Sequence, residues 1–303
     1  MPGSTRAFDI DGASSAPQSW GRRFTRGFRL YHRGNWLNVL ALSLVGLAIF
    51  LALFGELAAP YPPLEMDLTN RLAPPSPHHL FGTDDFGRDL LSRVIAGTRI
   101  SLQSALLVLS IASAIGFLVG SLAGFLGGWV DEILMRVTDL FLAFPALVLA
   151  VAIAATLGPG LTNTMIALTT VYWPWYARLV RSQVLSLRER EFILAAVCLG
   201  SSTPGLILRH VLPNVQPILI TQITLDVGYV ILSTAGLSFL GLGAQPPAPE
   251  WGATILASRS FMRESWWFPT FPGLALVLTV LGFNLLGDGL RDYLDPRLRG
   301  GGR

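Results

Sequence analysis

The sequence predicts an all-α polytopic membrane protein with six transmembrane helices. Of its 303 residues, 51% are hydrophobic and only 14% are charged, and the mean hydropathy is +0.53. Soluble domains carry about 25% charged residues, so an ordinary soluble fold is excluded. Apolar runs also recur at a length of about 20 residues, which a helix needs to cross a bilayer. The single cysteine, Cys198, excludes an internal disulfide and a multi-cysteine metal site.

Residues 1–35 are predicted to form a basic segment on the cytoplasmic side. Its arginines gather just before the first apolar run. A secretory signal is the alternative, but the apolar core of a signal spans about 7–15 residues and this run is longer. We therefore expect an uncleaved first transmembrane helix within residues 36–59, with Trp36 as an anchor at the membrane interface.

Residues 60–100 interrupt the apolar pattern with many prolines. We expect a periplasmic or extracellular loop that ends in an amphipathic helix. Asp84, Asp85 and Asp89 invite a calcium-loop interpretation, yet their spacing lacks the alternating oxygen ligands and the terminal Glu of an EF-hand. Turn and helix-cap roles are therefore predicted for these aspartates.

The other five spans are predicted within residues 101–290. They are placed at 101–125, 134–157, 162–179, 215–240 and 271–286. In the second span Gly116, Gly120 and Gly124 recur at every fourth residue, a spacing that lets a neighbouring helix backbone approach closely. That neighbour belongs either to the same chain or to another subunit, and the pattern leaves both open.

Acidic residues inside the spans are functional candidates by default, because burying a charge in a membrane is costly. Asp139 is expected to pair with Arg136, which lies three residues earlier on the same face of the third span, a span that also contains Pro145. Asp226 in the fifth span has two interpretations. It takes part in solute passage or gating, or a neighbouring hydroxyl such as that of Thr224 satisfies it.

An aromatic cluster surrounds Pro174 in the fourth span. It comprises Tyr172, Trp173, Trp175 and Tyr176. Such a cluster is typical of a belt at the water–lipid interface. The alternative is that Tyr172 and Trp175 line a solute path together with Asp226.

Two further polar stretches complete the outline of the chain. Residues 241–269 combine prolines with tryptophans and are expected to form a re-entrant or surface-lying external element. Residues 291–303 form a polar tail that is predicted to be cytoplasmic.

The segment 188–214 is the longest polar-punctuated stretch between two apolar blocks. It predicts two short helices broken at Gly200, because glycine suits the left-handed position that ends a helix. Thr203 followed by Pro204 is typical of a helix start. Pro213 is expected to end the second helix, because its ring removes a backbone donor. A helix–bend–helix between two spans is a candidate docking device.

The charge distribution orients the six predicted spans. Sixteen of the 22 basic residues fall on the side that holds both termini and segment 188–214. Under the positive-inside rule that side is cytoplasmic, so a bacterial or archaeal cytoplasmic (inner) membrane is expected. The net charge of +3 therefore points to cytoplasmic loops rather than to nucleic acid.

The chain is not expected to be an enzyme or to hold a cofactor or metal. Every one of its 22 basic residues is arginine, whereas the phosphate-binding loop of an ATPase needs a lysine. Neither G-x-S-x-G nor H-E-x-x-H occurs. Any ATP chemistry must come from a partner.

Residues 194–200, followed by Leu212 and Pro213, resemble the coupling motif of ABC importer permeases. That motif reads Glu-Ala-Ala, three residues, Gly, nine residues, Ile, one residue, Leu-Pro. Leu194 stands in place of the Glu and His210 in place of the Ile. Glu191, one turn earlier, is the candidate to replace the missing acid.

Other stretches resemble the C-type permease subunit of dipeptide, oligopeptide and nickel importers, and the likeness extends over residues 36–299. They lie at 81–93, 236–247, 249–252 and 284–292. The resemblance implies a type I ABC importer permease fold with a cytoplasmic coupling helix between the fourth and fifth spans. The coupling residues would be Glu191, Ala195, Ala196, Gly200, Ser201, Leu212 and Pro213.

The resemblance also implies partners and a cargo. The partners would be a related second permease, two ATPase subunits that bind ATP and magnesium, and an external solute-binding protein. The cargo would be a di- or oligopeptide, with nickel or a glutathione-like peptide as the alternative. A different class of protein, an ion-coupled secondary transporter with Asp226 or Asp139 as the carrier, is kept as the competing hypothesis.

Overall fold

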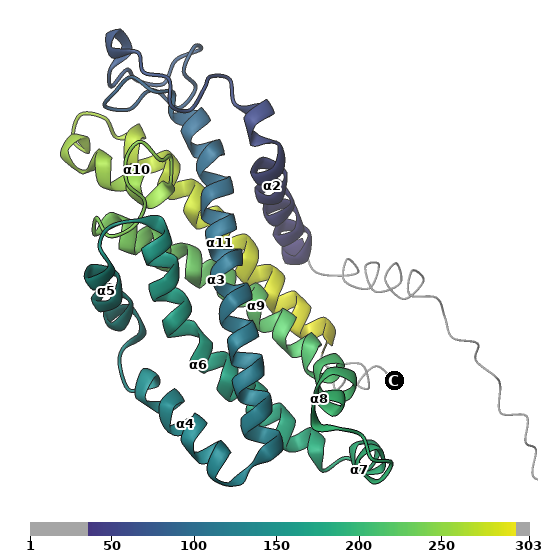
Figure 1. The fold of residues 1–303 in the computed structure, drawn as a ribbon. Coiled ribbons are helices and arrows are strands. Elements are labelled where there is room, and N and C mark those ends of the chain that lie inside the picture. Colours follow the sequence, from purple (N-terminus) through teal and green to yellow (C-terminus); the bar gives the residue numbers. More distant parts are fainter. Residues whose placement is uncertain (1–35, 295–303) are drawn as a thin grey trace, which may run out of the picture.

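The computed structural model describes residues 36–294, and all its regular elements are helices (Figure 1). Segment 1–35 and residues 295–303 of the predicted tail lie outside the described residues. Five long helices run side by side through the molecule. They are α2 (Trp36–Ala58), α3 (Leu90–Leu126), α6 (Leu161–Arg188), α9 (Leu212–Phe239) and α11 (Trp267–Leu294).

Shorter helices cover the two ends of this bundle (Figure 1). The loop between α2 and α3 lies at the same end as α10 (Trp251–Ser258), and we call this the α10 end. At the opposite end, the α7 end, lie α7 (Glu191–Cys198) and α8 (Thr203–Leu206).

Four described helices are long and apolar enough to cross a membrane, and a bent helix pair raises the number to five. The four are α2, α3, α11 and the continuous stretch Thr203–Phe239 that contains α9. Helix α6 is absent from this set because its threonines, Asn163 and the aromatic residues around Pro174 already dilute its apolar character before Arg178. The bundle is therefore that of a multi-pass membrane protein, and the sixth span stays a prediction.

Helix α3 is longer than the second span that the sequence predicts. It begins at Leu90, so the expected amphipathic helix and the span are one continuous element. The Asp89 side chain accepts a hydrogen bond from the backbone N–H of Ser92 at 2.8 Å. This bond satisfies one of the free donors of the first turn, which confirms the predicted cap role of Asp89.

The prediction of the third span as a single helix is wrong. The chain forms α4 (Gly128–Leu142) and α5 (Ala146–Leu157), which meet at an angle of 86°. Pro145 lies at this break and is the N-cap residue of α5. Its ring disfavours the helical conformation of the preceding residue, so α4 ends before the proline and a new helix begins after it.

The glycine series of α3 packs against α6 of the same chain. A Cβ atom built on Gly116 would lie 2.3 Å from Cβ of Tyr176, and one built on Gly120 would lie 2.4 Å from the carbonyl oxygen of Ala177. The space that these glycines leave is thus filled by the backbone of α6. This answers the question that the spacing alone left open, in favour of packing within the chain.

Gly120→Ala is expected to lower the stability of the protein by about 1–3 kcal/mol, because the added methyl group overpacks a rigid helix contact. The matched control is Gly46→Ala in α2, where a Cβ atom meets no atom within 4 Å. The measurement is the thermal inactivation midpoint of the purified membrane complex. Equal midpoints for the two variants would contradict the packing described here.

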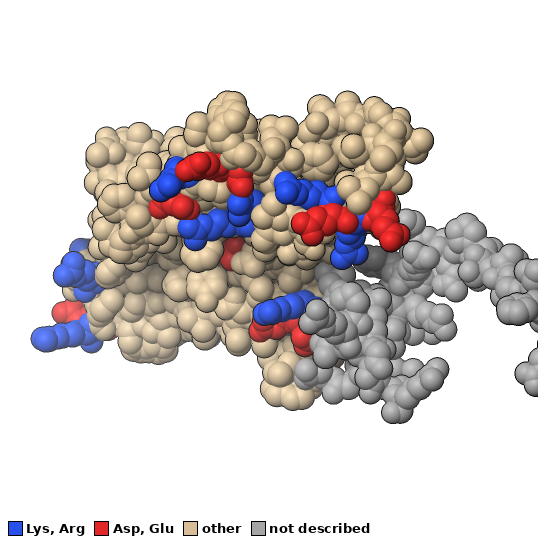
Figure 2. Space-filling model, turned by 90° about the horizontal axis from the view of Figure 1, so that it is seen from below, with Lys and Arg blue, Asp and Glu red and all other residues tan. Residues whose placement is uncertain are grey.

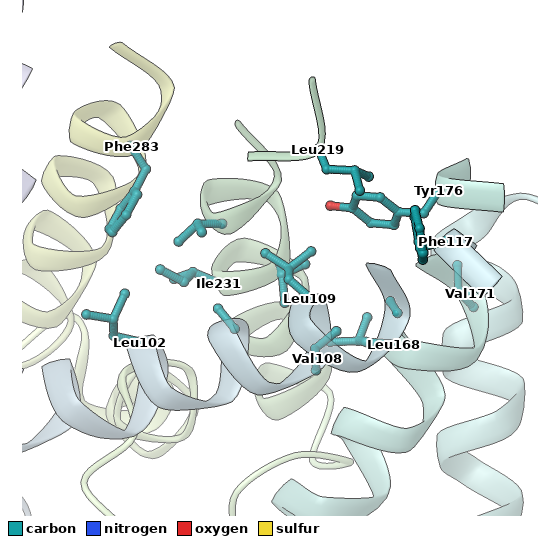
Figure 3. Close-up of a cluster of buried hydrophobic side chains, with 14 of the residues drawn as sticks. Leu102, Val108, Leu109, Phe117, Leu168, Val171, Tyr176, Leu219, Ile231 and Phe283 are labelled. Atoms are coloured by element: carbon teal, nitrogen blue, oxygen red, sulfur yellow. The ribbon is translucent and has the colours of Figure 1, made fainter. Parts of the chain in front are cut away.

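Apolar side chains from α3, α6, α9 and α11 form the main core (Figure 3). In this view Leu109 of α3 lies between Ile231 of α9 and Leu168 of α6. Leu102 of α3 lies instead on the side of Phe283 of α11. Tyr176 extends from α6 with its hydroxyl directed toward α9. Helix α3 is therefore the central element around which the other long helices pack.

Two tryptophans at the α10 end are buried in the protein, which corrects the expectation that they mark the water–lipid boundary. The indole of Trp251 donates to the Val94 carbonyl at 3.0 Å, and that of Trp267 donates to the Thr83 carbonyl at 3.3 Å. A buried indole N–H usually has an acceptor of this kind, because burial removes its hydrogen bond to water. Both tryptophans therefore tie the α10 end together.

Candidate functional site

Segment 188–214 folds as two helices with a bend, as its sequence predicts. Helix α7 ends near Gly200, whose φ of +82° is in the left-handed region that favours glycine. The N–H of Gly200 donates to the Val197 carbonyl at 2.9 Å, and that of Ser201 donates to the Ala196 carbonyl at 3.1 Å. These bonds satisfy the last carbonyls of α7, so the bend is a defined helix cap rather than a loose loop.

The second half of the segment differs from its prediction at both ends. The residue that precedes α8 is Ser202 rather than Thr203, and it makes no side-chain cap bond. Pro213 does not end a helix, because α9 begins at Leu212 and continues through the proline. A wide π-helical turn over Ile207–Val211 precedes it, in which the N–H of Leu212 donates to the Ile207 carbonyl. Proline is tolerated in the first turn that follows, where a missing N–H costs little.

The predicted coupling residues, in α7 and after it, differ in their exposure to solvent. Ala196 is buried toward the bundle together with Ile193, whereas Glu191, Ala195, Gly200, Ser201 and Pro213 are exposed and Leu212 is half-buried.

The exposed face of α7 is largely apolar, which the motif alone did not indicate. Leu194 is 52% exposed and Leu199 is 87% exposed, and Phe192 and Val197 are exposed as well. We call these four residues the α7 surface. Exposed apolar side chains gathered on one short helix are typical of a protein contact. The sequence signal for this surface is that apolar residues occur on all sides of α7, more than one buried face requires.

Both departures from the coupling motif lie at or near the α7 surface. Leu194 belongs to this surface and places an apolar side chain where the motif has an acid. The ring of His210 lies 6.3 Å from that of Phe192, measured between centroids. The tertiary structure thus joins α7 to the π-helical turn that follows it.

Ion pairs between α4 and α6 hold the bent span at the α7 end. Arg181 contacts both carboxylate oxygens of Asp131, with the longer bond at 2.6 Å, and Arg178 contacts Asp139 at 2.6 Å. Figure 2 shows basic and acidic side chains interleaved on the face seen from below. The predicted pair of Asp139 with Arg136 is wrong.

Arg136 instead contacts Glu132 at 3.4 Å, one turn before it on the same helix. Asp139 faces α6, where Arg178 reaches it from a neighbouring helix. The pair of Asp139 with Arg178 joins two helices, so the spacing of residues within one helix could not predict it.

Asp226 lies between α6 and α9 and accepts two hydrogen bonds. The Tyr176 hydroxyl donates to it at 2.7 Å, and the side-chain amide of Gln222 donates to it at 3.0 Å. Thr224 does not satisfy the acid, because its hydroxyl donates to the Ile220 carbonyl at 2.8 Å. Residues two apart in a helix face different sides. The spacing of four to Gln222 was the available sequence signal.

Asp226 belongs to a polar stripe on α9. The stripe comprises Gln222, Asp226, Tyr229 and Ser233, which follow one another at intervals of four, three and four residues and therefore share one helix face. Tyr172 of α6 interacts with both Ser233 and Asp226.

The structure thus brings Tyr172 to Asp226, as the solute-path interpretation requires. Trp175 lies on another face of α6 and is 61% exposed, whereas its neighbour Tyr176 is buried. Consecutive helical residues are about 100° apart around the axis, since a turn takes about 3.6 residues. The four aromatic residues around Pro174 therefore do not act as one cluster.

Within the described residues, no group of three or more His, Cys, Asp or Glu side chains is arranged to hold a metal ion. The site offers an apolar contact surface at the α7 end and a hydrogen-bonded acid inside the bundle.

Two family models match the chain. The model described as "binding-protein-dependent transport system inner membrane component" covers residues 116–300. The model described as "N-terminal TM domain of oligopeptide transport permease C" covers residues 23–75.

Individual relatives match over most of the chain. The probable D,D-dipeptide transport system permease protein of Escherichia coli (strain K12) is 46% identical, and the match covers 88% of this chain and 90% of that protein. The nickel transport system permease protein of the same strain is 44% identical, with 87% and 95% covered. A glutathione transport system permease protein of Escherichia coli O6:K15:H31 (strain 536 / UPEC) is 44% identical, with 91% and 90% covered.

A solved structure of the MetNI methionine ABC transporter in inward-facing conformations shares the fold. The TM-score is 0.53 at 18% sequence identity, and the match covers 67% of this chain and 96% of that chain. At this identity the likeness concerns the arrangement of the helices alone.

Proposed function

The chain belongs to the family of binding-protein-dependent transport system inner membrane components, and from this we propose that it forms half of the translocation path of an ATP-driven importer for di- or oligopeptides. The identity of 44–46% to permeases over most of the chain carries this proposal. Relatives named for nickel and glutathione transport are similar to the same degree, so these solutes are the alternative cargo.

In this proposal the chain acts within a complex of several subunits. A second, related permease completes the path, two ATPase subunits bind ATP and magnesium, and an external solute-binding protein delivers the cargo. The protein lies in the cytoplasmic membrane with both termini in the cytosol. The arginine count of the sequence supports this orientation.

We propose that α7 is the coupling helix between the fourth and fifth of six spans. The α7 surface supports this role, because Leu194 and Leu199 present apolar area at the end of the bundle. Contacts between α7, α8 and the π-helical turn connect this surface to α9. Movement of a docked ATPase would thus reach the long helices as a shift between inward-open and outward-open states.

Asp226 and Tyr172 are proposed to line the path, with Trp175 on a neighbouring face of the same helix. The polar stripe supports this assignment, since polar side chains within spans face a protein interior or a water-filled cavity.

Copurification and uptake test the proposed function. The chain is expressed with the permease, ATPase and binding-protein genes encoded beside it, and the purified complex is placed in proteoliposomes. We expect stoichiometric ATPase subunits and dipeptide uptake that requires ATP and the binding protein. Uptake by this chain alone under a proton gradient would instead support a secondary transporter.

A further inference from the structure

Asp226 is an acid between packed helices that has no cationic partner among the described residues. Asp131 and Asp139 pair with arginines of α6, and Glu56 pairs with Arg99. No described residue makes an ion pair with Asp226, whose partners are a tyrosine hydroxyl and an amide. An acid inside a bundle without a counter-charge is costly unless a cation comes to it.

We propose that Asp226 is a cation-receptive site on the translocation path, which binds the ammonium group of a peptide during passage. This inference rests on the proposed importer function and adds the chemical group that is recognised.

The hydrogen bonds of Asp226 hold its carboxylate while leaving room for a ligand. Each carboxylate oxygen accepts one bond, at 2.7 Å from Tyr176 and at 3.0 Å from Gln222. A carboxylate offers about four acceptor sites, so about two stay open. An ammonium group carries donors only and matches these open sites.

Tyrosine side chains near Asp226 favour a cation as well. Tyr172 and Tyr176 approach it from α6, and Tyr229 lies three residues further along α9. The hydroxyl oxygens of these tyrosines can accept hydrogen bonds from an ammonium group. Tyr229 is 61% exposed, so the stripe reaches a surface that the chain leaves uncovered. A ligand that arrives there meets Tyr229 first and Asp226 one turn away.

A purely structural role predicts something different. In that case the bond from Tyr176 to Asp226 only ties α6 to α9, and Asp226→Asn should be silent because an amide oxygen still accepts the tyrosine proton. The two interpretations differ in whether the charge of Asp226 matters. The experiments therefore compare the acid with the uncharged Asn at this position.

Thiol labelling of the assembled complex measures the charge effect directly. Tyr229→Cys serves as the reporter in a Cys198→Ser background, because Cys198 is an exposed free thiol. The reagents are a trimethylammonium-ethyl and a sulfonatoethyl methanethiosulfonate. With Asp226 present, we expect the cationic reagent to label the thiol at position 229 much faster than the anionic reagent. Asp226→Asn should reduce the ratio of the two labelling rates by about tenfold or more, because it removes one unit charge at about 5–6 Å from that thiol. An unchanged ratio, or no labelling by either reagent in any nucleotide state, would overturn the inference.

Uptake of radiolabelled alanyl-alanine into proteoliposomes provides the second readout. Asp226→Asn should lower the maximal rate by about tenfold, equivalent to the loss of about one good charged contact, and Asp226→Glu should restore part of it. Thr224→Val is the matched control and should transport normally. Equal uptake by wild type and Asp226→Asn would refute the cation site and leave the importer function intact. No uptake by wild type would refute the function itself.

Discussion

Gly200→Glu is expected to separate ATP hydrolysis from solute uptake. Gly200 has a φ of +82° at the end of α7, where most L-residues other than asparagine cost about 1 kcal/mol or more. The new side chain also places a charge beside Leu199 on the α7 surface. Each 1.4 kcal/mol lost in docking is about a tenfold loss in affinity, so we expect uptake to fall about tenfold or more. The measurement compares ATPase rate and uptake in the same proteoliposomes.

Gly200→Asn is the matched control for this substitution. Asparagine tolerates the left-handed conformation and carries no charge, so this variant should stay largely coupled. Space does not limit either variant, because a Cβ atom at Gly200 meets no atom within 4 Å. Normal coupled uptake by Gly200→Glu would exclude α7 as the coupling element.

Asp84→Asn is expected to destabilise the α10 end by about 3–5 kcal/mol, the usual result of removing one partner from a buried ion pair. The Asp84 side chain is fully buried and contacts Nε of Arg88 at 2.6 Å and Nε of Arg93 at 3.3 Å. It also accepts backbone bonds from Phe86 at 2.8 Å and from Arg88 at 3.0 Å. The amide leaves the buried guanidinium of Arg93 without its ion-pair partner, and leaves that of Arg88 with only the longer contact to Asp85 at 3.7 Å. The midpoint of thermal inactivation of the complex measures the loss.

Asp85→Asn is the control, and the expected effect has the opposite sign. Burial, and then the nearby charge of Asp84, raise the pKa of the Asp85 carboxyl. The folded state therefore binds this proton more tightly than the unfolded state, and the contribution of Asp85 to stability falls as pH rises from its ordinary value of 3.8 through the raised pKa. At neutral pH, Asp85→Asn removes this penalty and should stabilise slightly. A loss as large as that of Asp84→Asn would refute the assignment of the buried charge to Asp84.

Local signals in the sequence predict much of the fold. Apolar runs of sufficient length predict α2 and α11 because a span must satisfy its backbone bonds internally. The cap of α3 at Asp89 and the bend at Gly200 follow from the chemistry of single residues. Such features depend on atoms within a few residues of one another, so the order of residues is enough to predict them.

The prolines show where local reasoning is insufficient. Pro145 breaks the predicted third span into two helices, whereas Pro213 lies within the continuous stretch that leads into α9. Both residues remove the same backbone donor. The outcome differs because a π-helical turn precedes Pro213, so that the proline falls in the first turn of α9, where the helix tolerates it.

For the site, the order of residues was enough to predict the membrane class, the resemblance to importer permeases, the bend at Gly200 and the acid at Asp226. It did not show which groups meet. The folded chain brings Tyr176 and Gln222 to Asp226 and Arg178 to Asp139, and it exposes apolar side chains around Leu194. The physical reason is that composition and helix periodicity are properties of one segment. Hydrogen bonds and ion pairs between helices depend instead on the rotation and spacing of two segments, which are set by close contacts such as that of Gly120 with α6.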